Sequence, residues 1–376
     1  MRRYYFDHNA TTPVSDAVLE VYTNCLRDCH GNASSIHYHG QQAKMLLEGS
    51  RRQVAGFLGA TPKEVVFTSG GTEADNLAIF GVMRASRNRH AVTTAIEHPA
   101  VLNAFAKLER EGFKVTYLNC DPQGVVSVED LEQAMRPDTA LVSVIHANNE
   151  LGTLQDIDAL ARVAHAGGAL FHSDGVQAAG KIAVNTAMLG VDLYSVSGHK
   201  LNAPKGVGAL YVRKGITVQP VFYGGRHEQG RRAGTENVPA LVALGKAAEL
   251  AQVGDSQLRD RLENGLLHAI PHCRVNASGA RRIPNTTNIC FEGIEGEALL
   301  ISLDLKGFSV SSGAACSSGA VEPSHVLLAA GLTREEAKSS LRFSLGAGND
   351  EAQVDALIEA VAVSCTQLRR LSPTYV

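Results

Sequence analysis

A lysine and an aspartate each follow an apolar, strand-like run in the middle of the chain. Lys200 comes after residues 193–196 and a short Ser-Gly-His turn, and Asp174 closes the run that begins at Phe171. A lysine held where a buried strand ends is desolvated, which lowers its pKa and makes its amine a nucleophile toward carbonyls. Pyridoxal phosphate (PLP) needs such a lysine for a Schiff base and an aspartate beside its pyridine nitrogen. The pair predicts a PLP site; the alternative is that Lys200 is a surface lysine at a strand end.

A glycine turn joins a strand to a helix within residues 64–76, where Gly70 and Gly71 precede Thr72. Exposed amides at a helix N-terminus, together with the Thr72 hydroxyl, would form a cradle for a phosphate. The stretch matches neither a Walker A motif nor GxGxxG. Ordinary turn and capping chemistry is the alternative interpretation.

The segment from residue 64 to residue 212 alternates strand-like and helix-like patterns. This alternation predicts an α/β fold, in which a mostly parallel sheet is covered by helices. Ligands of such sheets bind beyond the carboxyl ends of the strands. The residues that directly follow such ends are Thr72, His98, Asn149, Asp174 and Lys200. We expect His98 to stack on a flat cofactor ring, although a histidine before proline is often a turn residue.

The pattern changes near residue 254, where pairs of strands with helices on one side begin. A large domain over residues 15–254 is therefore predicted, with a smaller α+β domain formed by residues 255–376 and 1–14. Residues 39–58 of the large domain are predicted to form an amphipathic helix with Arg51 and Arg52 on its polar side. Residues 220–237 are rich in glycine and basic residues, which fits a loop that reaches an anion or a partner subunit, or a solvated surface loop.

Two residues of the smaller domain are candidates for chemistry. Cys316 is surrounded only by serine, glycine and alanine, which would leave its thiol accessible; a chance cysteine in a linker is the alternative. Arg342 lies among apolar neighbours, and a buried arginine needs an anion. That anion would be an amino-acid carboxylate or the partner in a structural salt bridge.

Composition excludes several classes of function. The chain has 376 residues, is 44% hydrophobic and 19% charged, and carries a formal net charge of −3. These values give no basic field for nucleic acid, and no apolar run is long enough to cross a bilayer. We expect a cytoplasmic protein with reduced thiols. Cysteine and histidine residues cluster between positions 25 and 39, but their spacing matches no standard zinc pattern, so no metal is expected.

The chain closely resembles the cysteine desulfurases of the NifS and IscS type, which are PLP enzymes of the fold type I aminotransferase class. The resemblance extends over nearly the whole sequence. It rests on the segments at 7–12, 68–73, 97–98, 148–152, 197–200, 232–235, 311–316 and 342–346. It implies conversion of L-cysteine to L-alanine, with sulfur passed through a persulfide to an acceptor protein such as an iron–sulfur scaffold.

The resemblance also implies roles for single residues. Lys200 matches the Schiff-base lysine, Asp174 the pyridine partner and His98 the ring-stacking histidine, while Cys316 matches the sulfur-accepting nucleophile. Thr235 resembles a residue that reaches the phosphate from the other subunit, which implies a homodimer. The other carried-over positions are Gly71, Thr72, Ser197 and His199 at the phosphate, Asn149 and Gln177 near the ring hydroxyl, and Arg342 and Asn32 at the substrate carboxylate.

Two positions depart from the family pattern, because Ala33 replaces a usual proline and Leu328 a common basic residue. Two other functions remain open on the same residues. An aminotransferase or selenocysteine lyase would use Lys200 and Asp174 without requiring Cys316 for cysteine turnover. A weakly catalytic PLP-binding protein would act mainly as a docking or sulfur-carrier subunit.

Overall fold

The computed structural model describes residues 2–312 and 322–371, and its largest element is a sheet of seven strands in the order β2-β8-β7-β6-β5-β3-β4. Six of these strands run in the same direction. The exception is β8, which is antiparallel to both of its neighbours, β2 and β7. The bounds are β2 Val65–Thr68, β3 His90–Thr94, β4 Lys114–Leu118, β5 Thr139–Ser143, β6 Leu170–Asp174, β7 Leu193–Ser197 and β8 Gly208–Val212. The expected α/β class with a mostly parallel sheet is confirmed.

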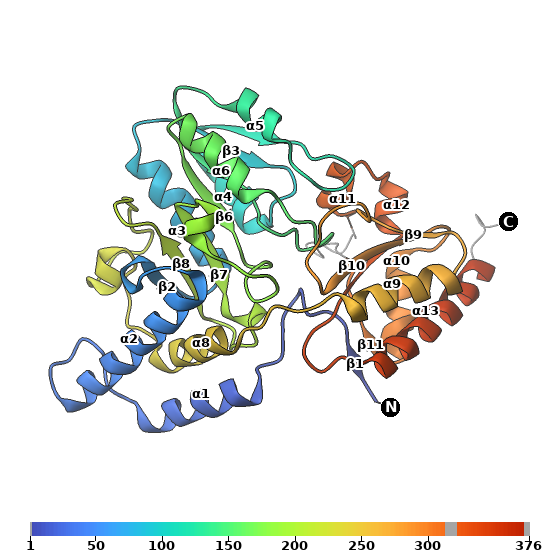
Figure 1. The fold of residues 1–376 in the computed structure, drawn as a ribbon, viewed down its shortest axis with the longest axis horizontal. Helices are drawn as coiled ribbons and strands as arrows, with labels where there is room; N and C mark the ends of the chain where they lie inside the picture. The colour runs from blue at the N-terminus through green and yellow to red at the C-terminus, as the bar shows by residue number, and fades with distance from the viewer. Residues whose placement is uncertain (1, 313–321, 372–376) are drawn as a thin grey trace.

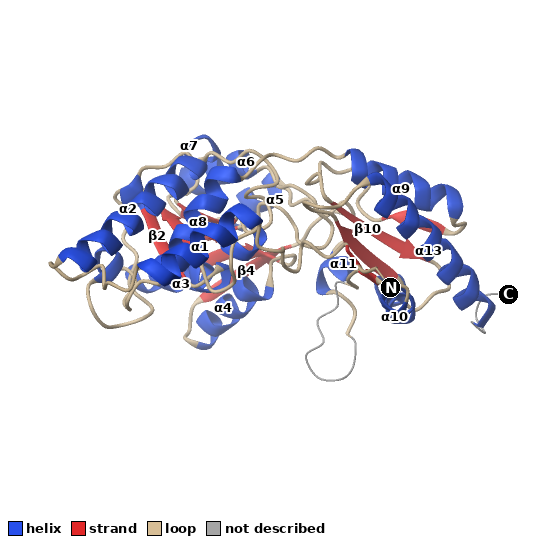
Figure 2. Cartoon of the chain, turned by 90° about the horizontal axis from the view of Figure 1, so that it is seen from below, coloured by secondary structure: helices blue, strands red, loops and turns tan. Residues whose placement is uncertain are grey.

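Helices cover both faces of this sheet (Figure 2), and each face has its own apolar core. One face packs against α3 (Gly71–Ala85) and α4 (Pro99–Arg110). The other is covered by α1 Asp16–Asp28, α2 Tyr38–Leu58, α5 Val128–Ala134, α6 Ile157–Ala166 and α8 Val238–Leu250, with the short α7 Thr186–Leu189 nearby. Burial on two faces explains why the central strands read as continuous apolar runs in the sequence.

A second, smaller sheet lies at the other end of the molecule (Figure 1). Its antiparallel strands β12 (Ser340–Ser344), β10 (Thr286–Phe291) and β9 (Cys273–Val275) carry an apolar core shared with three helices. These helices are α9 Gln257–Ala269, α10 Gly296–Leu305 and α13 Glu351–Leu371. The short helices α11 His325–Ala329 and α12 Arg334–Lys338 contribute buried side chains to an apolar core of the larger sheet.

The N-terminal segment packs on this smaller part, as expected. Its strand β1 (Tyr4–Tyr5) pairs in parallel with β11 (Phe308–Ser309), and both described ends of the chain lie on this side in Figure 1. The exact domain boundaries, at residues 14/15 and 254/255, stay a prediction.

The expectation that Arg51 lies on the polar side of its helix is wrong. Its side chain is 8% exposed and pairs with Glu228 of a distant loop, whereas Arg52 is exposed. Helical periodicity could not reveal this, because a loop that is remote in sequence covers that part of α2. Within residues 2–312 and 322–371, no helix combines the length and apolar character needed to cross a bilayer.

Candidate active site

Lys200 ends the short 3-10 helix η2 (Gly198–Lys200), which directly follows β7. Its Nζ donates hydrogen bonds to the backbone carbonyls of Asn9 and Ala10, the second at 2.7 Å. Burial, assisted by the positive charge of Arg342, lowers the pKa of Lys200 to about 8. An appreciable fraction of the amine is therefore unprotonated and nucleophilic near neutral pH.

Asp174 ends the adjacent strand β6 and is only 3% exposed. One oxygen accepts a hydrogen bond of 2.9 Å from the backbone amide of Val176. Burial raises the pKa of this carboxyl, while the neighbouring charges of His98 and Lys200 act in the opposite direction. None of the ion pairs within residues 2–312 and 322–371 involves Asp174. A buried carboxylate in this position favours a cationic partner from a ligand.

His98 caps the N-terminus of α4 just beyond β3. Its Nδ1 accepts a hydrogen bond of 3.1 Å from the amide of Ala100, and Pro99 occupies the first helical position, where no amide is needed. The residue is exposed, so a planar ligand could reach its ring. The charges of Asp174 and Lys200 both act on His98, which shows that the three groups share one site.

The N-terminus of α3 lies beside the end of β7. Gly70 is the N-cap and has no side chain, so no capping oxygen occupies the first-turn amides. A Cβ on Gly71 would lie 2.8 Å from a methyl group of Val176 and 3.5 Å from the Cβ of Ser197. The buried hydroxyl of Ser197 has no hydrogen-bond partner within the described part of the chain, and Thr72 is exposed. These groups can hold an anion of phosphate size.

His199 lies between Lys200 and the N-terminal segment. Its Nδ1 is 3.2 Å from the hydroxyl of Thr11, and its backbone carbonyl accepts hydrogen bonds of 2.9 Å from both the amide and the hydroxyl of Thr12. Burial, followed by the charge of Lys200, lowers the pKa of His199 to about 4. The imidazole is thus neutral at physiological pH, with one ring nitrogen available as a donor.

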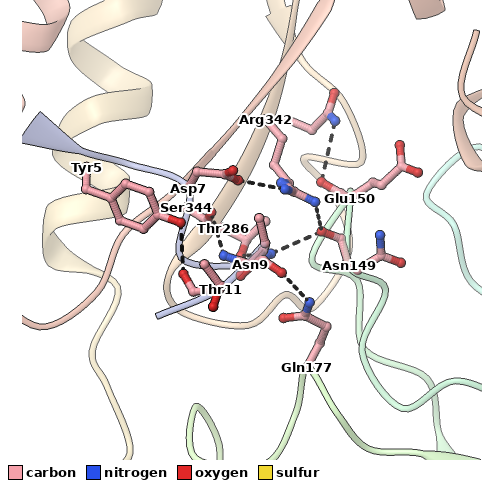
Figure 3. A network of polar contacts seen from close by, with 12 residues as sticks. Tyr5, Asp7, Asn9, Thr11, Asn149, Glu150, Gln177, Thr286, Arg342 and Ser344 are labelled. Carbon is pink, nitrogen blue, oxygen red and sulfur yellow. Dashed lines mark hydrogen bonds and ion pairs between the residues drawn. The ribbon is translucent and has the colours of Figure 1, made fainter. Parts of the chain in front are cut away.

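Asn9 connects the elements around the site, as Figure 3 shows. Its side-chain amide donates to the carbonyl of Asn149 at 3.1 Å and to the hydroxyl of Thr286 at 2.8 Å. Its backbone carbonyl accepts from the Gln177 amide at 2.9 Å, and its Oδ1 accepts from the buried Lys181 at 2.8 Å. Asn9 is not among the predicted site residues, although it lies in one of the segments that resemble the family. Of the two residues predicted near the ring hydroxyl, Gln177 uses its side-chain amide for the hydrogen bond to Asn9. The buried Oδ1 of Asn149 has no partner within the described residues.

Arg342 of β12 is 6% exposed and joins this network (Figure 3). Its guanidinium forms an ion pair of 2.7 Å with Asp7 and donates to the carbonyl of Asn149 at 3.0 Å. Its Nε is buried without a partner in the described part of the chain. The sequence left two partners open for Arg342, an amino-acid carboxylate or a structural salt bridge. The structure contains the salt bridge with Asp7, and the Nε donor is available for a further anion.

Asn32 and Thr235 are not part of this cluster. Both line a separate cavity of about 790 Å³ next to Arg51 and Glu228. The loop between α1 and α2, which carries Asn32, lies at the opposite end of the molecule from the smaller sheet, to which the strand of Arg342 belongs (Figure 1). Asn32 Oδ1 accepts a hydrogen bond of 2.9 Å from the amide of Ser34. Cys316 lies outside the described residues.

The described cysteine and histidine side chains form neither a disulfide nor a metal site. The six described cysteines are free thiols. In residues 2–312 and 322–371, no group of three histidine, cysteine, aspartate or glutamate side chains is arranged to hold a metal ion.

Comparison with known proteins places this site in a family. The family model described as "Aminotransferase class-V" matches residues 4–357 of this chain. The chain belongs to the class-V aminotransferase family. A relative from Trichormus azollae named "Cysteine desulfurase" is 48% identical, over 98% of this chain and 94% of that protein.

Solved structures agree with this placement. A structure called "NIFS-LIKE PROTEIN" superposes with a TM-score of 0.90 at 37% identity, covering 97% of this chain and 100% of the other. "SspA in complex with cysteine" superposes with a TM-score of 0.82 at 36% identity, covering 91% and 98% of the two chains. The predicted family and fold class are both confirmed.

Proposed function

We propose that this protein is a PLP-dependent cysteine desulfurase, which converts L-cysteine to L-alanine and transfers the sulfur to Cys316 as a persulfide. The observation that carries the proposal is the Lys200–Asp174 pair at adjacent strand ends, in a chain 48% identical to a protein named cysteine desulfurase over nearly its full length. The structure of a relative in complex with cysteine supports the choice of substrate.

The residues around Lys200 fit PLP. The uncapped N-terminus of α3, with Gly71, Thr72 and the Ser197 hydroxyl, which has no partner among the residues that the structure describes, would take its phosphate. Asp174 would face the pyridine nitrogen, His98 would stack on the ring, and Asn149 and Gln177 would contact the ring hydroxyl. His199 would join the groups around the phosphate. When bound, PLP supplies an electron-accepting ring that stabilises negative charge at the substrate Cα.

The protein's own residues bind the substrate and move its protons. Lys200, with a pKa of about 8, can take a proton from Cα and return one. The Arg342 guanidinium is buried beside the site, and its Nε has no partner among the described residues, so it would attract the substrate carboxylate in addition to Asp7. Asn32 lies apart from Arg342 of its own chain, so it would assist the carboxylate that is bound in the partner subunit.

The sulfur transfer balances without an external oxidant. The Cys316 thiolate attacks the sulfur of cysteine, an S–S bond forms, and the Cβ–S bond breaks with its electron pair remaining on carbon. The carbon then takes up a proton, and L-alanine leaves. The persulfide sulfur subsequently passes to the thiol of an acceptor protein, such as an iron–sulfur scaffold.

The active unit in this proposal is a cytoplasmic homodimer. Thr235 lies apart from the Lys200 cluster of its own chain, so it would reach the phosphate of the partner subunit. Exposed apolar side chains close to Thr235 and Asn32 in sequence support an interface here, since Tyr223 is 84% and Ile36 93% exposed.

The test measures alanine and sulfide production from L-cysteine by the purified protein with PLP and a reductant. Lys200→Ala should abolish turnover. Cys316→Ser should still bind PLP and L-cysteine but release little sulfur, and Cys120→Ser serves as the matched control. Mass spectrometry should find one extra, reducible sulfur on the Cys316 peptide. A persulfide on Cys25, Cys120 or Cys290, with an active Cys316→Ser variant, would refute the role of Cys316.

A further inference from the structure

A buried ion pair fixes the loop that carries Thr235. The guanidinium of Arg51, in α2, donates two parallel hydrogen bonds of 2.7 Å to the carboxylate of Glu228. The two side chains are only 8% and 2% exposed. The same carboxylate accepts a hydrogen bond of 2.9 Å from the Phe67 amide of β2, and Arg51 also donates to the carbonyl of Val65 at 2.9 Å. The loop is thereby attached to the edge strand of the large sheet.

The backbone at this attachment is strained. Glu228 and the next residue, Gln229, have φ values of 48° and 59°, inside the 3-10 segment η3 (His227–Gly230). Residues with side chains rarely adopt this left-handed region, and two in succession persist only where the surroundings impose them. The Arg51–Glu228 pair, with its additional hydrogen bonds, supplies that constraint.

A second ion pair holds the loop a few residues later. Arg232 donates to the two oxygens of Glu73 at 2.7 Å and 3.3 Å, and Glu73 also accepts from the amide of Ser69 at 2.8 Å. Glu73 belongs to the first turn of α3, next to Thr72 of the proposed phosphate site. The loop is therefore tied to both elements that flank this site, β2 and α3.

Thr235 lies three residues after Arg232, which forms the second ion pair, and it is exposed. A short segment anchored in this way cannot fold back freely, so the position of its hydroxyl depends on the two ion pairs. We propose that Arg51, Glu228 and Arg232 are positioning residues that present Thr235 to the phosphate group bound by a second copy of this chain. This inference rests on the proposed function, because it needs both the bound PLP phosphate and the homodimer.

The first test measures PLP binding to apoprotein by fluorescence titration, with the oligomeric state followed by sedimentation. Glu228→Gln keeps the side-chain shape but removes the charge, and Arg232→Gln breaks the less buried pair in case the first variant folds poorly. Loss of a hydrogen bond to a phosphate should weaken PLP binding about tenfold in either variant. Arg136→Gln, which breaks an exposed ion pair with Asp138, is the control and should bind PLP like the wild type. Wild-type affinity in both folded loop variants would overturn the inference.

The second test uses mixed dimers, assayed at a PLP concentration near the wild-type dissociation constant. In the first mixture, a Lys200→Ala subunit pairs with a Glu228→Gln subunit. The one working centre then receives an intact loop from its partner, so about half of the wild-type dimer activity is expected. In the second mixture, a subunit with both substitutions pairs with a wild-type subunit, whose centre now receives the altered loop and should be weakly active.

The two mixtures separate the possible failures. Equal activities would mean that the loop does not act across the interface, which would overturn the positioning role while leaving the desulfurase proposal standing. A fully active monomer in sedimentation would refute the homodimer itself, and this inference with it.

Discussion

Replacing Glu97 by glutamine tests how a buried carboxyl beside the site affects stability. Glu97 lies between β3 and His98 and is 0% exposed. Its Oε1 accepts both of its hydrogen bonds, from the Thr94 hydroxyl at 2.8 Å and the Ile145 amide at 2.7 Å. Its Oε2 has no partner within the described residues, so it can carry a proton. Burial raises the pKa of this carboxyl from 4.5 to about 8. The folded protein therefore holds Glu97 in its neutral form at pH 7.

The size of the effect follows from the two pKa values. Between pH 4.5 and about 8 the folded chain keeps a proton that the unfolded chain has lost, so the contribution of Glu97 to stability falls as pH rises through this window. The interval is roughly 3.5 pH units, each worth about 1.4 kcal/mol. The total is about 5 kcal/mol, of which about 3 to 4 kcal/mol falls between pH 5 and pH 8.

Glutamine has the same shape and cannot ionise. Relative to the wild type, Glu97→Gln should therefore become more stable by about 3 to 4 kcal/mol on going from pH 5 to pH 8. Urea unfolding of both proteins at pH 5, 6.5 and 8 measures this difference. The exposed Glu359→Gln of α13 is the control and should show no such trend. A stability difference that stays constant with pH would show that Glu97 ionises normally and would refute the reasoning.

Three further predictions concern the burial of Lys200 and the hydrogen bonds of Ser324 and Tyr194. Burial lowers the pKa of Lys200 to about 8, so the apoprotein amine should react with a carbonyl reagent with a midpoint near pH 8; a midpoint near 10.5 would contradict this. Ser324→Ala removes a hydrogen bond of 2.6 Å to the buried Glu150 carboxyl and should cost about 1–3 kcal/mol in urea unfolding. Tyr194→Phe removes the hydrogen bond of 2.8 Å to His146 and should cost about 0.5–1.5 kcal/mol, whereas a stabilised variant would show that this bond is unfavourable.

The strand ends were the part of the site that could be read from the sequence. Asp174, Lys200 and His98 follow apolar runs, and parallel strands bring their carboxyl ends to one edge of a sheet. Alternation of strands and helices was therefore enough to group these residues. The glycine turn before Thr72 was also recognisable, because a helix start without a capping side chain is a local feature.

Contacts between distant segments were not accessible in this way. Asp7 and Arg342 are 335 positions apart, and Arg51 and Glu228 are 177 apart. Periodicity describes which side of an element is apolar, but not which remote loop will cover it. For this reason Arg51 was placed on the polar side of its helix, and the network around Asn9 was not foreseen.

The sequence by itself determined the α/β class, the family and the positions of the groups that follow the strands, because these depend on local patterns and on motifs of neighbouring residues. Only the tertiary structure decided which anion holds Arg342, which carbonyls hold the Lys200 amine, and which carboxyls are buried strongly enough to stay protonated. Those properties depend on desolvation and on charges brought together by folding, and a linear pattern contains neither.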